Sequence, residues 1–169
     1  MSRAQALELG LTDGQIKAML IGRRWCTHLP GIYLTFTGPV PPRTRVWGAL
    51  RYAGEGAIAC LATAAWLWGL CSDPPARIEV CVPPRRQVVN RPGVHVASRR
   101  HLDILRHPVA KPPRTRLEET VLDLIDRAAN AEEVVALITG ACQRRFTTAT
   151  RLGQCARSRK RLRLSLIHI

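Results

Sequence analysis

Glycines and helix-capping residues divide the first 36 residues into two short helical segments and a hairpin-like stretch. Ser2 can cap a helix that Gly10 then ends, because a serine side chain accepts from the free N–H groups of a first turn and glycine suits a C-cap. Thr12 and Gln15 have the spacing of a capping box, and the segment that they open ends at Gly22. Two short helices hinged at a glycine are typical of a helix-turn-helix.

A basic hairpin is predicted directly after these two helices. Residues 23–29 and 32–36 are rich in β-prone side chains, and Pro30-Gly31 between them is a typical turn. The first run begins with two arginines. The order helix, turn, helix and basic hairpin predicts an N-terminal winged helix-turn-helix over residues 1–37.

A proline-rich linker separates this unit from a second domain, which we predict over residues 43–155. Residues 38–42 contain three prolines and a glycine, a composition that forms neither a helix interior nor a central strand. The predicted class is therefore α+β, with a winged helix followed by a mixed α/β domain. The expected helices are 46–53, 63–70, 117–125, 134–138 and 147–155, and the expected strands are 57–60, 77–82 and 94–98, of which the last two form a hairpin ribbon.

The charge balance indicates a polyanionic partner. The chain has 26 basic and 12 acidic residues, which give a formal net charge of +14, and only three of the basic residues are lysines. The planar fork of arginine suits phosphates and guanine edges better than lysine does. Eight basic residues and no acid lie between Arg144 and Arg163, so this stretch carries +8 of the +14. Composition alone does not distinguish DNA from RNA.

The C-terminal residues 156–169 are expected to be a basic tail that ends in a non-native segment. Residues 164–169 follow the basic run without a cap, a turn or helical spacing. They correspond to the translation of a transposon adapter used in sequencing-library preparation, so they do not enter the interpretation of fold or function. On this interpretation the natural protein continues beyond residue 163.

Composition and spacing also exclude several classes of protein. Apolar residues make up 46% of the chain, which is enough to bury a core. The longest apolar run, 57–71, is too short to span a bilayer and no secretion signal precedes it, so we expect a cytoplasmic protein without a membrane partner. The six cysteines lack the spacing of a zinc knuckle and are expected to be reduced thiols. We expect no cofactor and no metal.

The second helix and the hairpin carry the candidate DNA-binding residues. Gln15 can read adenine edges and Lys17 can contact phosphate or guanine, whereas Asp13 would repel phosphates. The alternative is that Gln15 only completes the capping box and that the arginines of the hairpin only keep an exposed strand edge soluble. The predicted DNA-binding residues are Thr12, Gln15, Lys17, Ala18, Arg23, Arg24 and His28.

Two further groups of charged residues are interpreted from their positions. Arginines at the ends of the 77–98 ribbon either extend a DNA footprint or are simply solvated; they are Arg85, Arg86, Arg91, Arg99 and Arg100. A group of carboxylates lies near a predicted helix start, where negative charge favours the helix dipole, so we interpret it as structural and not hydrolytic. Its members are Glu118, Glu119, Asp123 and Asp126.

Eight stretches of the sequence match, in order, the pattern of a known family. The N-terminal stretches are Arg3-Ala4-Gln5-Ala6, Gly10-Leu11-Thr12, Gln15-Ile16, Gly22-Arg23-Arg24-Trp25 and Leu29-Pro30-Gly31-Ile32-Tyr33. The later stretches are Ala64-Ala65-Trp66-Leu67-Trp68-Gly69-Leu70, Pro113-Arg114-Thr115-Arg116 and Thr120-Val121-Leu122-Asp123-Leu124. Over most of residues 2–128 the chain thus resembles AbiEi-type antitoxins of type IV toxin–antitoxin systems, most of all their actinobacterial branch.

This resemblance implies a DNA-binding antitoxin that is also a transcriptional regulator. Its winged helix would repress its own promoter, and its second domain would oppose a cognate toxin of the nucleotidyltransferase class. Members of the family have a further helix ahead of the segment that begins here at Ser2. We therefore expect the helical core of this winged helix to lack its first helix.

The sequence lacks the nuclease signature of some relatives of this family. Those relatives carry a C-terminal restriction-endonuclease-like domain, whose active site needs an acid two residues before a lysine. The three lysines of this chain are preceded at that distance by Gln15, Val109 and Ser158. We therefore expect no enzyme and no catalytic residues. The alternatives are a fragment of a two-domain nuclease whose catalytic part lies past the break, and a general basic RNA-binding protein.

Overall fold

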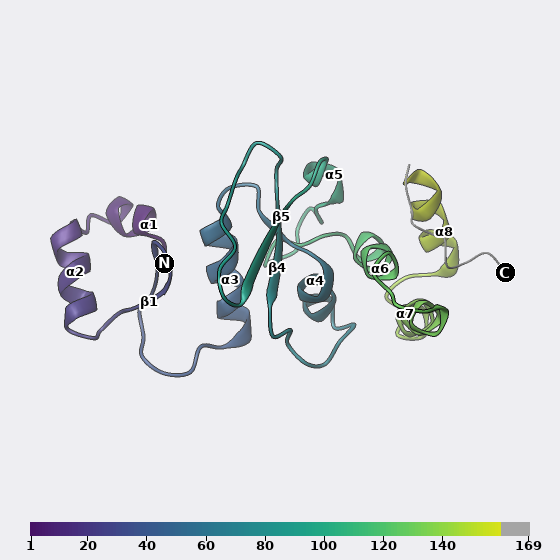
Figure 1. The fold of residues 1–169 in the computed structure, drawn as a ribbon, viewed down its shortest axis with the longest axis horizontal. Helices are drawn as coiled ribbons and strands as arrows, with labels where there is room; N and C mark the ends of the chain where they lie inside the picture. The colour runs from purple at the N-terminus through teal and green to yellow at the C-terminus, as the bar shows by residue number, and fades with distance from the viewer. Residues whose placement is uncertain (160–169) are drawn as a thin grey trace.

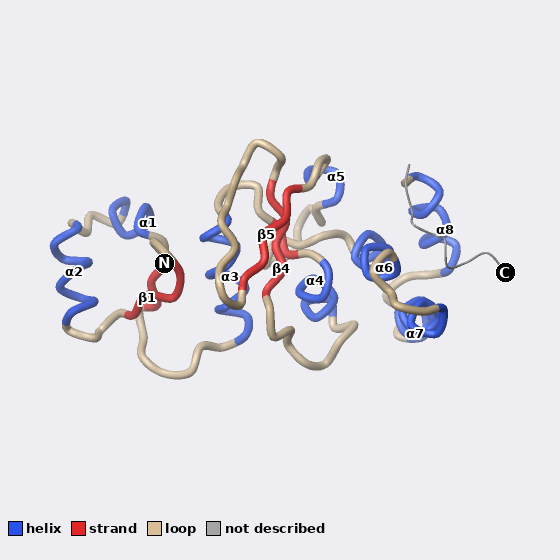
Figure 2. The backbone as a smooth tube through the Cα atoms, in the orientation of Figure 1, coloured by secondary structure: helices blue, strands red, loops and turns tan. Residues whose placement is uncertain are grey.

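The computed structural model describes residues 1–159, which form eight helices and two small sheets (Figures 1 and 2). The predicted mixture of helices and strands is confirmed, and none of the described helices is long and apolar enough to cross a membrane. The helices are α1 (Arg3–Glu8), α2 (Asp13–Ile21), α3 (Pro42–Ala53), α4 (Leu61–Trp68), α5 (Leu102–Leu105), α6 (Leu117–Ile125), α7 (Ala131–Gln143) and α8 (Ala149–Ser158). The strands are β1 (Cys26–Leu29), β2 (Ile32–Leu34), β3 (Ile58–Ala59), β4 (Ile78–Val82) and β5 (Val94–Ser98).

Helices α1 and α2 begin at the residues that the sequence predicts. Ser2 caps α1 and Thr12 caps α2, each in a capping box with the glutamine three residues later. Gly22 is the C-cap of α2. Each helix buries one residue, Ala6 in α1 and Ile16 in α2, so these helices bury little apolar surface by themselves.

The first sheet is the predicted hairpin, and the start of the chain pairs with its β2 edge. Strands β1 and β2 are antiparallel. Ser2 forms an antiparallel bridge with Ile32, and the amide of Tyr33 donates to the Met1 carbonyl over 2.8 Å. The N-terminal residues therefore lie beside the hairpin as a third extended segment.

The second sheet has the order β3-β4-β5, with β4 at its centre. Strand β3 is antiparallel to β4, whereas β5 is parallel to it. All five residues of β4 are buried, because α3 covers one face of the sheet and α4 lies on the other (Figure 1). Arg114 adds a further bridge alongside Ala59 of β3.

The prediction that β4 and β5 form a hairpin is wrong, since the two strands run parallel. Parallel strands need a connection that returns to the starting end, and residues 83–93 make this return beside α3. The Tyr52 hydroxyl donates to the Val89 carbonyl over 2.8 Å, and Arg86 donates to the carbonyl of Ala53. An alternating pattern is compatible with both strand directions, so it does not by itself predict whether the pair is parallel or antiparallel.

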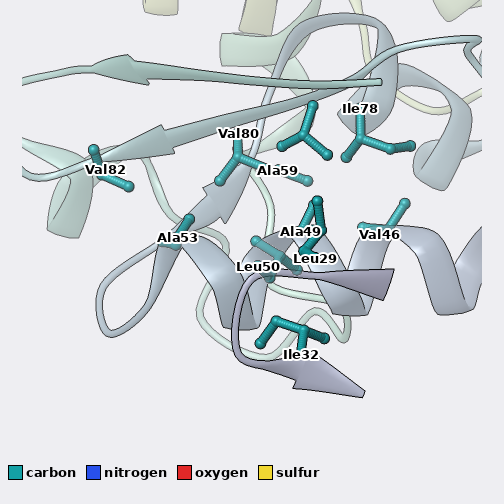
Figure 3. Packing of buried hydrophobic residues seen from close by; sticks show 12 residues of the cluster. Leu29, Ile32, Val46, Ala49, Leu50, Ala53, Ala59, Ile78, Val80 and Val82 are labelled. Atoms are coloured by element: carbon teal, nitrogen blue, oxygen red, sulfur yellow. The ribbon is translucent and has the colours of Figure 1, made fainter. Parts of the chain in front are cut away.

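One hydrophobic core joins the N-terminal hairpin to the second sheet (Figure 3). Leu29 and Ile32 of the hairpin pack against one side of α3, and β4 packs against the other. The buried members are Leu29, Ile32, Val46, Ala49, Leu50, Ala53, Ala57, Ala59, Ile78, Val80, Val82 and Val94. The linker predicted at 38–42 therefore connects two units that share a core, and α3 already begins at Pro42.

Helices α6, α7 and α8 pack together at the end of the molecule opposite α1 and α2 (Figure 1). Helix α8 continues to Ser158, beyond residue 155 where the second domain was expected to end. The side chain of Arg159, directly after this helix, is only 12% exposed. The rest of the expected basic tail and the segment 164–169 lie outside the described residues, so those predictions stay predictions.

Candidate nucleic-acid interface

One face of α2 is open to solvent and carries predicted base-reading residues. Ile16 is buried and fixes the opposite face against the molecule. Gln15, Lys17 and Ala18 are exposed, as is Thr12 at the N-cap. The structure therefore leaves these four predicted residues accessible to solvent at the N-cap and along α2.

The capping box of α2 holds the Gln15 side chain in one orientation. Its Oε1 accepts from the Thr12 backbone N–H over 2.8 Å and lies 3.2 Å from the Thr12 hydroxyl. In return, the Gln15 backbone N–H donates to that hydroxyl oxygen over 3.2 Å. Both interpretations of Gln15 are therefore compatible with the structure, because the amide caps the helix and still lies on the exposed face.

The acidic residue on this face is paired with an arginine. Arg3 of α1 forms a bidentate ion pair with Asp13, with Nε 2.9 Å from Oδ1 and Nη2 2.7 Å from Oδ2. This hydrogen-bonded pair raises the pKa of Arg3 above its ordinary value. A guanidinium bonded to both carboxylate oxygens reduces the repulsion between Asp13 and a phosphate, which was the main argument against a DNA-binding role for this face.

The start of the hairpin presents two arginines to solvent. Arg23 and Arg24 are both exposed, and neither forms an ion pair with a carboxylate among residues 1–159. Arg23 has a φ of 53°, a left-handed conformation that closes the turn after α2. Two exposed arginines without carboxylate partners are suited to phosphate contacts.

His28, the remaining predicted residue, lies against α3. A Cβ atom built on Gly48 would lie 2.6 Å from the Cδ2 atom of His28, so glycine permits this close approach of β1 to the helix. Burial lowers the pKa of His28, and the positive charges of Arg45 and the N-terminal amine add to the effect. This half-buried position favours packing between hairpin and helix as the role of His28.

Two arginines of the second domain cap the C-terminal end of α4. Arg114 donates to the Leu67 carbonyl over 2.7 Å and stacks over the Trp68 ring with its guanidinium carbon 4.4 Å from the ring centroid. Arg144 donates to the carbonyls of Gly69 and Leu70 over 2.7 and 3.1 Å. Cations stabilise the C-terminal end of a helix. The tryptophan and proline–arginine stretches that carry the family resemblance thus have a structural role here.

An arginine–carboxylate network holds α8 to α6 and to the end of β5. Arg159 donates from Nε to Glu119 over 2.9 Å and from Nη2 to Asp123 over 2.8 Å. Arg99 forms a bidentate pair with the same Asp123. Asp126 lies 3.6 Å from Nη1 of Arg159. We refer to these five residues as the arginine–carboxylate network.

This network corrects two interpretations made from the sequence. The helix dipole suits Glu118 and Glu119 in the first turn of α6, but Asp126 is the C-cap of that helix and Asp123 lies within its last turns. Their carboxylates face arginines instead. Arg99 is paired with a buried carboxylate, so it does not extend a DNA footprint as a free cation.

A groove of about 780 Å³ runs beside the network. Its lining includes Arg100, His101 and Ser158 in addition to the network itself. Glu119 also accepts from the Cys155 thiol over 3.0 Å, and burial together with this carboxylate raises the pKa of that thiol to about 12.

Within residues 1–159, no group of three or more histidines, cysteines or carboxylates is arranged to hold a metal ion. The sequence did not identify this cluster because its members are far apart in the chain: Arg159 lies 36 residues after Asp123, and Arg99 lies 24 residues before it.

Comparison with known proteins agrees with the resemblance seen in the sequence. Residues 57–120, from β3 to the start of α6, match the family model of the AbiEi antitoxin C-terminal domain. The resemblance to AbiEi-type antitoxins is confirmed. The matched segment contains the second sheet, α4 and Arg114, and it begins after the predicted DNA-binding residues.

Solved structures provide a comparison of the fold. The crystal structure of the RV2827C protein from Mycobacterium tuberculosis is similar with a TM-score of 0.58 and 19% sequence identity. The similarity covers 90% of this chain and 63% of that one, so this chain spans less than two thirds of that protein's length. At this identity the likeness concerns the fold alone. No curated protein matches the chain.

Proposed function

We propose that this AbiEi-type protein is a DNA-binding antitoxin and transcriptional regulator that represses its own promoter. The observation that carries the proposal is the exposed face of α2, on which the one acidic side chain is already paired with Arg3. Gln15, Lys17 and Ala18 on this face remain accessible to a base edge or a phosphate. Such a regulator would act in the cytoplasm, where its operator lies.

The proposed DNA-binding unit is a winged helix. Helix α2 would enter the major groove as recognition helix, and the hairpin β1–β2 would form the wing. The extended pairing of Ser2 with Ile32 supports this assignment, because it anchors the start of α1 to the wing. Arg23 and Arg24 lie between α2 and β1, where they would contact the phosphates that flank the groove.

The second domain would supply the antitoxin function. It contains the match to the AbiEi antitoxin C-terminal domain at residues 57–120. We propose a nucleotidyltransferase-class toxin as the activity that it opposes. The carboxylates of the arginine–carboxylate network are paired with arginines, an arrangement that competes with metal binding, so we expect no Mg²⁺-dependent cleavage of plasmid DNA by the purified protein.

The proposal is tested by binding to three labelled ligands at several salt concentrations. They are the duplex upstream of the protein's own gene, a scrambled duplex of the same composition, and a structured RNA. We expect the upstream duplex to bind at least 1,000-fold more tightly than the scrambled one, at the low end of the range of specific regulators, which is roughly 10³ to 10⁷. Equal affinity for the two duplexes would contradict the proposal, and a preference for the RNA would favour the basic RNA-binding alternative.

A further inference from the structure

We infer that Gln15 reads a base edge that presents only hydrogen-bond acceptors, guanine or thymine, and does not read adenine. This inference rests on the proposed DNA-binding function of α2. It concerns which of the two ends of the Gln15 amide is available to DNA. The capping box at the start of α2 decides that question.

The orientation of the amide follows from its partner. The atom that faces the Thr12 backbone N–H at 2.8 Å must be an acceptor, since an N–H group can only donate. This identifies it as Oε1 and turns the Nε2 amino group away from the helix N-terminus. The Thr12 hydroxyl, 3.2 Å away, approaches the same oxygen. Both lone pairs of Oε1 are therefore engaged within the protein.

The free end of the amide determines the base that it can recognise. Reading adenine with glutamine requires both ends of the amide, because the oxygen accepts from N6 while the nitrogen donates to N7. With its oxygen engaged, Gln15 has only N–H donors to offer. Guanine presents the acceptors N7 and O6, and thymine presents O4, whereas cytosine presents a donor and adenine a donor beside its acceptor.

The other capping box of the chain provides a matched control. Gln5 on α1 forms the same arrangement, with Oε1 accepting from the Ser2 backbone N–H over 3.0 Å. Gln5 is half-buried and lines a groove that faces α3, so it does not lie on the exposed face of α2. A substitution at this position tests the effect of changing a capping box without changing the proposed reading face.

The experiment is a binding selection from DNA duplexes with a randomised central segment, using the full chain. Gln15→Glu keeps the acceptor that caps the helix and replaces the free donors by a second acceptor. Gln5→Glu makes the same change in α1. We expect one position of the enriched motif to be guanine or thymine for the unchanged protein and for Gln5→Glu. Gln15→Glu should shift the preference at that position by about fivefold towards cytosine or adenine and leave the other positions unchanged.

Each other outcome has a distinct meaning. Adenine at the position that Gln15→Glu alters would overturn the inference, because the capping box must then open on DNA. An unchanged motif with Gln15→Glu would also overturn it, since Gln15 would read no base. No enriched motif for the unchanged protein would overturn the proposed function itself. Gln15→Met, which removes both ends of the amide, gives a second test if Gln15→Glu does not fold; it should abolish the preference at that position alone.

Discussion

Arginine serves opposite purposes at the two ends of this molecule. Beside α2, Arg23 and Arg24 are exposed and have no carboxylate partner among the described residues. Beside α6, Arg99 and Arg159 are largely buried and share the carboxylates of Glu119 and Asp123. The first pair is available to a polyanion, whereas the second pair stabilises packing between helices.

The comparison shows that a net charge of +14 does not by itself locate a nucleic-acid surface. The run from Arg144 to Arg163 is the most basic part of the sequence, yet Arg144 caps α4, Arg151 pairs with Glu118, and Arg159 belongs to the network. Arginines that are engaged in this way would have to give up internal hydrogen bonds or ion pairs to donate all their N–H groups to a phosphate. The N-terminal unit is less basic, but Arg23 and Arg24 beside the wing have no such partners among residues 1–159.

The largest effect is expected from Arg159→Ala. The substitution leaves Glu119 without its main partner in a buried site and weakens the neutralisation of Asp123. Removal of one partner of a buried ion pair costs about 3–5 kcal/mol of unfolding free energy, which chemical denaturation measures. Arg157→Ala, at an exposed position in the last turn of α8, is the matched control and should change stability by less than about 0.5 kcal/mol. Equal costs for the two variants would mean that the network contributes nothing to stability.

The double substitution Arg23→Ala with Arg24→Ala tests whether the exposed arginines beside α2 contact DNA. We expect the slope of log affinity for DNA against log salt concentration to fall in magnitude by about two, because two phosphate contacts are lost. The free energy of unfolding should stay nearly constant, since both side chains are exposed. Arg100→Ala with Arg157→Ala removes the same charge from exposed positions of the second domain and should leave the slope unchanged. A similar loss of slope in both double variants would indicate that only net charge matters.

Gly48→Ala tests the packing of the N-terminal hairpin against α3. Alanine normally stabilises a helix interior relative to glycine, but here its methyl group would meet the His28 ring. We expect a loss of about 1–3 kcal/mol in unfolding free energy from this overpacking. Gly140→Ala, in α7 with no atom near its added methyl, should instead stabilise by up to about 1 kcal/mol. If His28→Ala does not restore part of the loss in the Gly48→Ala background, the clash lies elsewhere.

The smallest effect is expected from pH, through His28. Its folded-state pKa is lowered, chiefly by burial, so the unfolded chain binds more protons than the folded one as the pH falls below about 6.5. Stability attributable to His28 is therefore fully present above that pH and is lost as the pH falls towards the folded pKa. Unfolding free energies at pH 7.5 and 5.0 should differ less for His28→Gln than for the unchanged protein. An identical difference would show that His28 is not desolvated against α3.

Local sequence was sufficient to predict much of the secondary structure. Some elements depend on contacts between residues close in the chain, so the sequence alone predicts them. They are the capping boxes of α1 and α2, the Pro30-Gly31 hairpin and most later helices. The single-turn helix α5 was not predicted, because the residue before it, His101, adopts a left-handed conformation instead of forming a side-chain cap. The exposure of Gln15 and Lys17 also followed from helical periodicity around the buried Ile16.

The sequence by itself determined where helices and turns begin, the basic character of the chain and its resemblance to AbiEi-type antitoxins. Only the tertiary structure decided that β4 and β5 run parallel and that His28 packs against Gly48. It also decided which arginines form ion pairs within residues 1–159. The reason is that strand direction and ion pairing depend on residues far apart in the chain, such as Arg159 and Asp123, and no local pattern specifies which carboxylate will meet which arginine when the helices pack.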